Sequence, residues 1–120
     1  MGEKECLVID DVTTVQKILD GMVEALGFAP VNASDGLEGL VRFEQRRTPL
    51  VLVDAEITGR LNAEEVATSI KHLAPETFVI IVTEGESTIQ REAASQADAI
   101  LHKPFGLGAL QSALRPLSRA

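Results

Sequence analysis

Aromatic residues are scarce in this chain of 120 residues: they make up 3% of it, and tryptophan and tyrosine are absent. The chain therefore offers few platforms for stacking nucleic-acid bases and no aromatic clamp for a flavin ring. Its single cysteine excludes an internal disulfide and a multi-cysteine metal site. The apolar runs are too short to cross a bilayer, and the polar start is unlike a signal peptide. We expect a cytoplasmic protein without a membrane partner.

Positive charge is also in short supply. Eleven lysines and arginines face 18 aspartates and glutamates, which gives a net charge of −7. An acidic domain repels phosphate backbones, so direct binding to nucleic acid is not expected. Apolar residues at 45% and charged residues at 24% are ordinary for a globular domain. The length predicts one domain over residues 1–120.

Short apolar runs rich in β-branched residues predict strands. The strong runs are 6–9, 50–53 and 78–82, and weaker ones are 29–33 and 99–102. Continuous rather than alternating apolar residues are typical of strands that are covered on both faces, as in a parallel sheet.

Helical stripes lie between these runs. Repeats of three and four residues predict four helices: Val15–Leu26 closed by Gly27, one that begins with Leu37, Leu40 and Val41 after Ser34-Asp35 as a possible cap, Val66–Leu73 after Asn62, and Leu107–Leu117. Ser87–Gln96 has helical propensity but few apolar residues, so we expect the loosest packing there. The alternation predicts an α/β fold, a doubly wound three-layer sandwich with a parallel sheet.

Polar residues follow the three strong strands and the weaker strand 99–102 where these strands end: Asp10, Asp11, Asp54, Thr83 and Lys103. Right-handed crossovers bring the carboxyl ends of all strands to one edge of the sheet, where ligands bind in such folds. Three carboxylates there repel one another, and a hard cation such as Mg²⁺ relieves the repulsion. An aspartate can act as a nucleophile towards phosphorus, and a lysine and a hydroxyl can contact phosphoryl oxygens.

Each of these residues also has a purely structural interpretation. Asp10 and Asp11 could begin the first helix, and Thr83 could cap the next one. Lys103 and the following proline could form only a turn. Because all five residues occur at strand ends together, the functional interpretation is favoured.

Four motifs resemble the receiver domain of two-component response regulators, which has the CheY-like, flavodoxin-like fold. They are the pair Asp10-Asp11 after an apolar run, Leu50-Val51-Leu52-Val53-Asp54, Ile80-Ile81-Val82-Thr83 and Lys103-Pro104-Phe105. The resemblance covers nearly the whole chain and implies a (βα)5 architecture with strand order 2-1-3-4-5. Residues 1–120 would then be a single receiver domain.

The resemblance also implies roles for these residues. Asp54 would accept a phosphoryl group from a sensor histidine kinase or a histidine phosphotransfer protein. Asp10, Asp11, Asp54 and the backbone carbonyl of Glu56 would hold Mg²⁺. Lys103, before a cis proline, would contact the phosphoryl group, and Thr83 would be the switch hydroxyl. Such a domain signals through a changed partner-binding surface, and it catalyses only its own phosphorylation and dephosphorylation.

Three positions depart from the family's pattern. Ile100 stands where a switch aromatic is usual, Thr58 replaces a proline after the acceptor, and Glu84 replaces a small residue after the threonine. A long acidic side chain at that point could repel an anionic phosphodonor. The departures keep open a second hypothesis, a pseudo-receiver that binds a partner without phosphorylation.

Two further classes fit less well. A phosphatase of the haloacid dehalogenase type needs a second aspartate two positions after the first, and Val12 stands there. A flavodoxin needs a phosphate-binding first loop, but residues 10–14 are acidic and lack glycine.

Overall fold

The computed structural model describes residues 4–84 and 96–118. Five parallel strands form one sheet in the order β2-β1-β3-β4-β5, as the resemblance implied. The strands are β1 (Lys4–Ile9), β2 (Phe28–Ala33), β3 (Leu50–Asp54), β4 (Phe78–Glu84) and β5 (Ala99–Lys103). Every residue of β3 is buried, which confirms that a continuous apolar run marks a strand covered on both faces.

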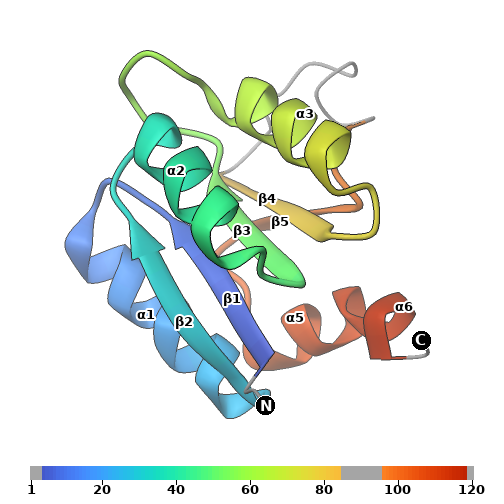
Figure 1. The fold of residues 1–120 in the computed structure, drawn as a ribbon. Coiled ribbons are helices and arrows are strands. Elements are labelled where there is room, and N and C mark those ends of the chain that lie inside the picture. The colour runs from blue at the N-terminus through green and yellow to red at the C-terminus, as the bar shows by residue number, and fades with distance from the viewer. Residues whose placement is uncertain (1–3, 85–95, 119–120) are drawn as a thin grey trace.

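Helices cover both faces of the sheet (Figure 1). They are α1 (Thr13–Ala25), α2 (Gly36–Arg46), α3 (Ala63–Leu73), α5 (Leu107–Ala113) and α6 (Arg115–Ser118). Helices α2 and α3 lie on one face, and α1 and α5 lie on the other. The three-layer α/β sandwich is therefore confirmed. None of the described helices is long and apolar enough to span a membrane.

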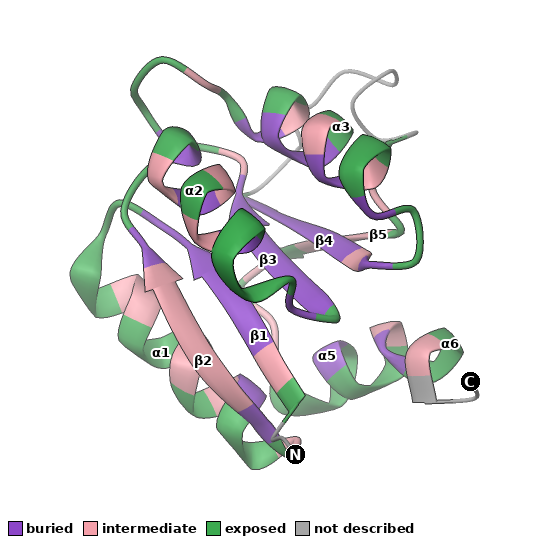
Figure 2. Cartoon of the chain, viewed as in Figure 1, coloured by how far each residue is buried: buried purple, intermediate pink, exposed green. Residues whose placement is uncertain are grey.

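The core has two halves, one on each side of the sheet. Leu7 and Ile9 of β1 pack in the half under α2 and α3. Cys6 and Val8 pack in the half under α1 and α5. Figure 2 shows the central strands buried between these layers, while the outer faces of the helices are exposed. The central strands are thus held on both sides, which fixes where their carboxyl ends lie.

Helix ends follow the predicted signals. The side chain of Asp35 accepts the backbone N–H of Glu38 at 2.8 Å and begins α2. Asn62 and Glu65 form a reciprocal capping box at the start of α3. Gly27 has φ of 93°, a left-handed conformation that suits glycine, just after α1.

The apolar stripe predicted for α2 is partly wrong. Leu37 and Val41 are about half exposed, and the face on the sheet is formed by Gly36, Gly39 and Phe43. A Cβ on Gly39 would lie 2.4 Å from the side chain of Ile9, so the helix backbone approaches the sheet closely there. Leu40 of the predicted stripe packs against the core, whereas Leu37 and Val41 lie beside this close approach and face outward.

The single helix predicted for Leu107–Leu117 is divided in two. α5 ends at Ala113, and α6 begins at Arg115. Pro116 explains the division, because proline has no N–H to donate and its ring collides with the preceding helical turn. Residues 87–95 of the segment expected to pack most loosely lie outside the described residues.

Candidate functional site at the carboxyl edge of the sheet

Three aspartates meet where β1 and β3 end. One carboxylate oxygen from each of Asp10, Asp11 and Asp54 lies within 4.8 Å of the others. Asp10 and Asp54 are buried, whereas Asp11 is exposed. We call these three residues the acidic edge. Their convergence, predicted from the order of strands and helices, is confirmed.

The two carboxylate oxygens of Asp10 have different surroundings. Oδ1 accepts the backbone N–H of Val12 at 2.9 Å, just before α1 begins. Oδ2 is buried and has no hydrogen-bond partner within the described residues. The structural interpretation of Asp10 is confirmed for one oxygen, which supports the start of the helix, and its role as a metal ligand through the other oxygen stays a prediction.

Burial raises the pKa of Asp10 above its ordinary value, and the charge of Asp54 raises it further. The Val12 N–H and the charge of Lys103 act in the opposite direction, and they do not cancel the effect of burial. A cation beside Oδ2 would remove the cost of ionising this carboxyl group.

Lys103 reaches across the sheet to Asp54. Its Nζ lies 3.3 Å from Oδ1 of Asp54, and only 3% of Asp54 is exposed. The Lys103–Pro104 peptide bond is cis, as expected from the resemblance. The lysine is placed to contact any group that is attached to this carboxylate.

Thr83 lies next to the end of β4 and is fully buried. Its hydroxyl oxygen has no hydrogen-bond partner in the part of the chain that the structure describes. A buried hydroxyl without a partner is costly in a folded protein, which is consistent with a group kept for a ligand.

Glu56 lies in the turn that follows β3. The N–H of Ile57 donates to the carbonyl of Asp54 at 3.3 Å, so the chain reverses at this point. The Glu56 side chain is exposed. The predicted metal contact of its backbone carbonyl stays a prediction.

Two contacts at the site were not predicted. Nε2 of Gln16 donates to the carbonyls of Asp10 and Ala33, which joins the ends of β1 and β2 to α1. Gln16 continues the buried stripe of Leu19 and Val23 toward the start of α1, and a polar residue in that stripe was the available signal.

The second contact comes from one of the departures. Oγ1 of Thr58 donates to Oδ2 of Asp11 at 3.1 Å. The residue that replaces the usual proline thus holds the exposed member of the acidic edge. Ile100 is partly buried and packs against the core half under α2 and α3, and Glu84 is exposed at the end of β4, opposite Lys103 in the strand register.

The residues present fit a magnesium ion. Every candidate ligand of the acidic edge is a carboxylate oxygen, which is the donor type that Mg²⁺ prefers. The unpartnered, buried Oδ2 of Asp10 supplies the structural sign that a ligand belongs there.

A doubly wound sheet with carboxylates, a hydroxyl and a lysine at its carboxyl edge defines a CheY-like α/β domain. The profile of the response regulator receiver domain matches residues 6–115. The chain therefore belongs to the response regulator receiver family.

Individual relatives agree with this assignment. The sporulation initiation phosphotransferase F of Bacillus subtilis is 27% identical over 118 residues, which cover 96% of this chain and 94% of that protein. The receiver domain of NtrX from Brucella abortus superposes with a TM-score of 0.85 at 26% identity, over 97% of this chain and all of that one. The probable transcriptional regulator ycf27 of Cyanophora paradoxa is 25% identical over 99% of this chain, which spans only half the length of that protein.

Proposed function

We propose that this domain is a phosphorylation-dependent signalling switch with Asp54 as the phosphoacceptor. The observation that carries the proposal is the grouping at one edge of a buried aspartate, a lysine 3.3 Å from it and two further carboxylates. Family membership supports phosphorylation-dependent signalling in general. The particular donor and the roles of the individual residues are part of the proposal.

In the proposed reaction, a carboxylate oxygen of Asp54 attacks the phosphorus of a phosphohistidine on a sensor histidine kinase or a histidine phosphotransfer protein. The new P–O bond forms as the P–N bond breaks, and the bonding pair stays on the imidazole nitrogen. The histidine leaves as a neutral imidazole with one proton, which it takes from water if the phosphohistidine ring did not already carry it. Lys103 neutralises charge on the phosphoryl oxygens, and the hydroxyl of Thr83 donates a hydrogen bond to one of them. The Bacillus subtilis relative is named as a phosphotransferase, which is consistent with this chemistry.

Asp10, Asp11, Asp54 and the backbone carbonyl of Glu56 would hold Mg²⁺ at this edge. When bound, the ion would supply positive charge to the transferred phosphoryl group. Asp10 would contribute through Oδ2, since Oδ1 already accepts the N–H of Val12.

The proposal describes a switch and not a turnover enzyme: the domain would catalyse only its own phosphorylation and dephosphorylation. Phosphorylation would shift an equilibrium between two conformations and so change how a downstream protein or output domain binds. The net charge of −7 supports output through protein contacts rather than direct contact with nucleic acid. We propose a cytoplasmic location, where ATP supplies such kinases.

Intact-mass spectrometry after incubation with acetyl phosphate and Mg²⁺ tests the proposal. We expect a mass increase of one phosphoryl group that requires Mg²⁺ and is absent from Asp54→Ala. The matched control is Asp98→Ala, since Asp98 is an acid far from the site that pairs with Lys71. This control variant should still gain the phosphoryl mass.

A wild-type protein that stays unmodified with both acetyl phosphate and a phosphorylated histidine kinase would contradict the proposal. That outcome would favour the pseudo-receiver hypothesis, which rests on Ile100, Thr58 and Glu84. If Glu84 repels small anionic donors, Glu84→Ala should be phosphorylated faster by acetyl phosphate than the wild type.

A further inference from the structure

A groove of about 530 Å³ lies between α2 and α3, two helices that cover the same face of the sheet (Figure 1). Its lining surface is mainly apolar. The groove is lined by residues that include Leu37, Leu40, Val41 and Glu44 of α2 and His72 and Leu73 of α3. We call this feature the α2–α3 groove.

Several apolar side chains that are not part of the buried core are exposed in the groove. Leu37 is 50% exposed, Val41 is 48% exposed and Leu73 is 40% exposed. They are half of the six large hydrophobic residues that are exposed in the described part of the chain. Single exposed apolar residues are ordinary, but a cluster in one groove is typical of a binding surface.

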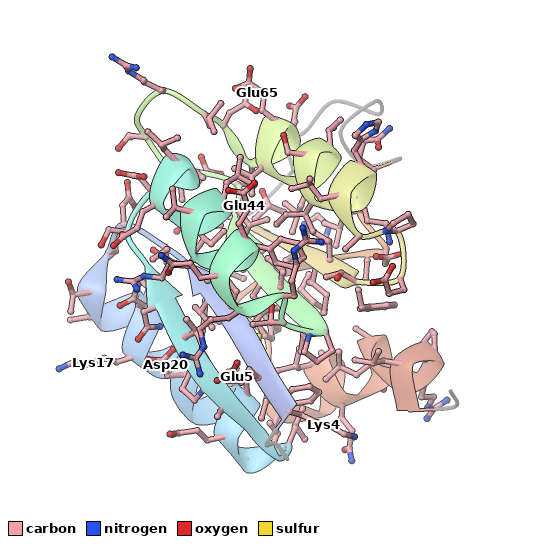
Figure 3. All side chains as sticks on the ribbon, in the orientation of Figure 1. Lys4, Glu5, Lys17, Asp20, Glu44 and Glu65 are labelled. Atoms are coloured by element: carbon pink, nitrogen blue, oxygen red, sulfur yellow. The ribbon has the colours of Figure 1, made fainter. Side chains whose placement is uncertain are left out.

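The spacing on α2 fits a helical partner. Leu37, Val41 and Glu44 follow one another at steps of four and three residues, so they form one stripe along the helix that faces α3. Figure 3 shows the Glu44 side chain between the two helices. A largely apolar groove between two helices is the geometry that receives an amphipathic helix.

The charges beside the groove indicate which sign of charge a partner should carry. Three cations of α2 and α3 already have acidic partners: Arg42 pairs with Glu38, Arg46 with Glu5 and Lys71 with Asp98. Arg47, at the C-terminal cap of α2, donates to the carbonyl of Leu73 and forms no ion pair among the described residues.

Glu44 and Glu64 likewise make no ion pair among the described residues. Two glutamates without an ion pair outweigh the single arginine without one, so the remaining charge beside the groove is negative on balance. A basic partner would complement it.

We propose that the α2–α3 groove binds an amphipathic helix of a partner protein, with apolar residues in the groove and a lysine or arginine beside Glu44. A second copy of this chain is a poorer occupant. A twofold contact would bring the unpaired glutamates of one copy toward those of the other, and each copy carries a net charge of −7. The proposal does not depend on phosphorylation of Asp54.

The test uses the unphosphorylated protein and a synthetic helical peptide with leucines at every third or fourth position and lysines at the flanks. A matched peptide has glutamate in place of each lysine. Binding is followed by fluorescence anisotropy of a label on the peptide, and the site is mapped from amide shifts in ¹⁵N NMR spectra. We expect the lysine peptide to bind and the shifts to concentrate on α2 and α3.

Variants distinguish the groove from general attraction to an acidic protein. Leu37→Ser combined with Val41→Ser should weaken binding at least tenfold. Ile18→Ser, at a more exposed apolar residue of α1, should leave binding unchanged. Glu44→Lys should weaken binding of the lysine peptide and strengthen binding of the glutamate peptide. Melting curves confirm that each variant is folded.

Three results would overturn the proposal. The first is a set of shifts that centre away from α2 and α3. The second is an equal loss of binding in Ile18→Ser and in the groove variant. The third is a dimer, seen by sedimentation, that Leu37→Ser with Val41→Ser dissociates, because the occupant would then be a second copy.

Discussion

Asp10 serves two purposes with its two carboxylate oxygens. One accepts the N–H of Val12 at the start of α1, and the other is buried beside Asp54 without a partner. The pKa of Asp10 is raised, mainly because the carboxyl group is buried. Between its ordinary value, 3.8, and the higher value in the folded state, the folded protein binds more protons than the unfolded chain. Stability contributed by Asp10 is therefore lost as pH rises through this window.

Asp10→Asn should stabilise the protein at neutral pH when EDTA removes metal ions. The amide keeps an oxygen for the Val12 N–H and carries no buried charge. The advantage over the wild type should shrink as the pH falls toward 4, where the wild-type carboxyl becomes protonated. Thermal melts at several pH values measure the difference. A variant less stable than the wild type at neutral pH would contradict this reading of Asp10.

Thr58 is expected to position Asp11 for the metal. Its hydroxyl donates to Asp11 at 3.1 Å, and outer partners of this kind support metal ligands. Thr58→Val should weaken Mg²⁺ binding about tenfold, near the low end of the usual range for losing such a partner. Thr58→Ser keeps the hydroxyl and should bind nearly as the wild type does. Titration calorimetry with MgCl₂ measures the Mg²⁺ affinity of both variants. Equal affinities in Thr58→Val and Thr58→Ser would refute a positioning role for the Thr58 hydroxyl.

Residue types and strand order were enough to predict the acidic edge, because parallel strands end at a common edge. The contact between Thr58 and Asp11 could not be predicted in this way. It depends on the path of the loop between β3 and α3, which passes through Gly59 with φ of 109°. Such loop geometry leaves no periodic signal in the sequence.

Helix α2 shows why the stripe of an element is predicted less well than its existence. A cap at Ser34-Asp35 was predicted from a local signal, and the structure places it at Asp35. The inward face depends on which residues let the backbone come close to the sheet and to the loop before α3. Glycines at positions 36 and 39 decide this, and apolar periodicity gives them no weight. Pro116, in contrast, is a helix-breaking residue that can be seen in the sequence. The apolar stripe Leu107–Leu117 continues past it, so the stripe alone predicted one helix instead of two.

Two glycines in helices should respond oppositely to alanine. A Cβ on Gly36 would lie 2.9 Å from the backbone oxygen of Leu61 and 2.8 Å from the side chain of Val66. Gly36→Ala should therefore destabilise the fold by about 1–3 kcal/mol, as overpacking does. Gly21 of α1 has nothing within 4 Å of its added Cβ. Gly21→Ala should stabilise it by about 0.5–1 kcal/mol through helix propensity.

Urea denaturation of the two variants against the wild type gives both free energies. A Gly36→Ala protein that is as stable as Gly21→Ala would show that α2 does not press on the loop before α3. The pair separates packing from propensity, since both substitutions add the same methyl group to a helix.

Across the whole molecule, the excess of negative charge is unevenly distributed. Part of the net charge of −7 is concentrated at Asp10, Asp11 and Asp54, whose oxygens lie within 4.8 Å of one another. Composition indicated an acidic domain. The fold collects three of its carboxylates around one point, while Lys103 offsets only part of their repulsion.

Mg²⁺ should raise the Tm of the wild type, because an ion that binds only the folded state stabilises it. At a tenfold excess over its Kd the gain is about 1.4 kcal/mol. Asp10→Asn should lose most of this response, and Glu64→Gln, an acid on α3 without an ion pair among the described residues, should keep it. A Tm that does not change with Mg²⁺, or a response that is equal in all three proteins, would contradict a metal site at the acidic edge.

The position of the phosphoryl group is the central claim, and chemical trapping tests it most directly. Borohydride reduces an aspartyl phosphate to homoserine, and tandem mass spectrometry of the digested protein then reads which aspartate was modified. After acetyl phosphate and Mg²⁺, we predict homoserine at position 54 alone. Homoserine at position 10 or 11, or at no aspartate of a protein that has gained the phosphoryl mass, would contradict the account.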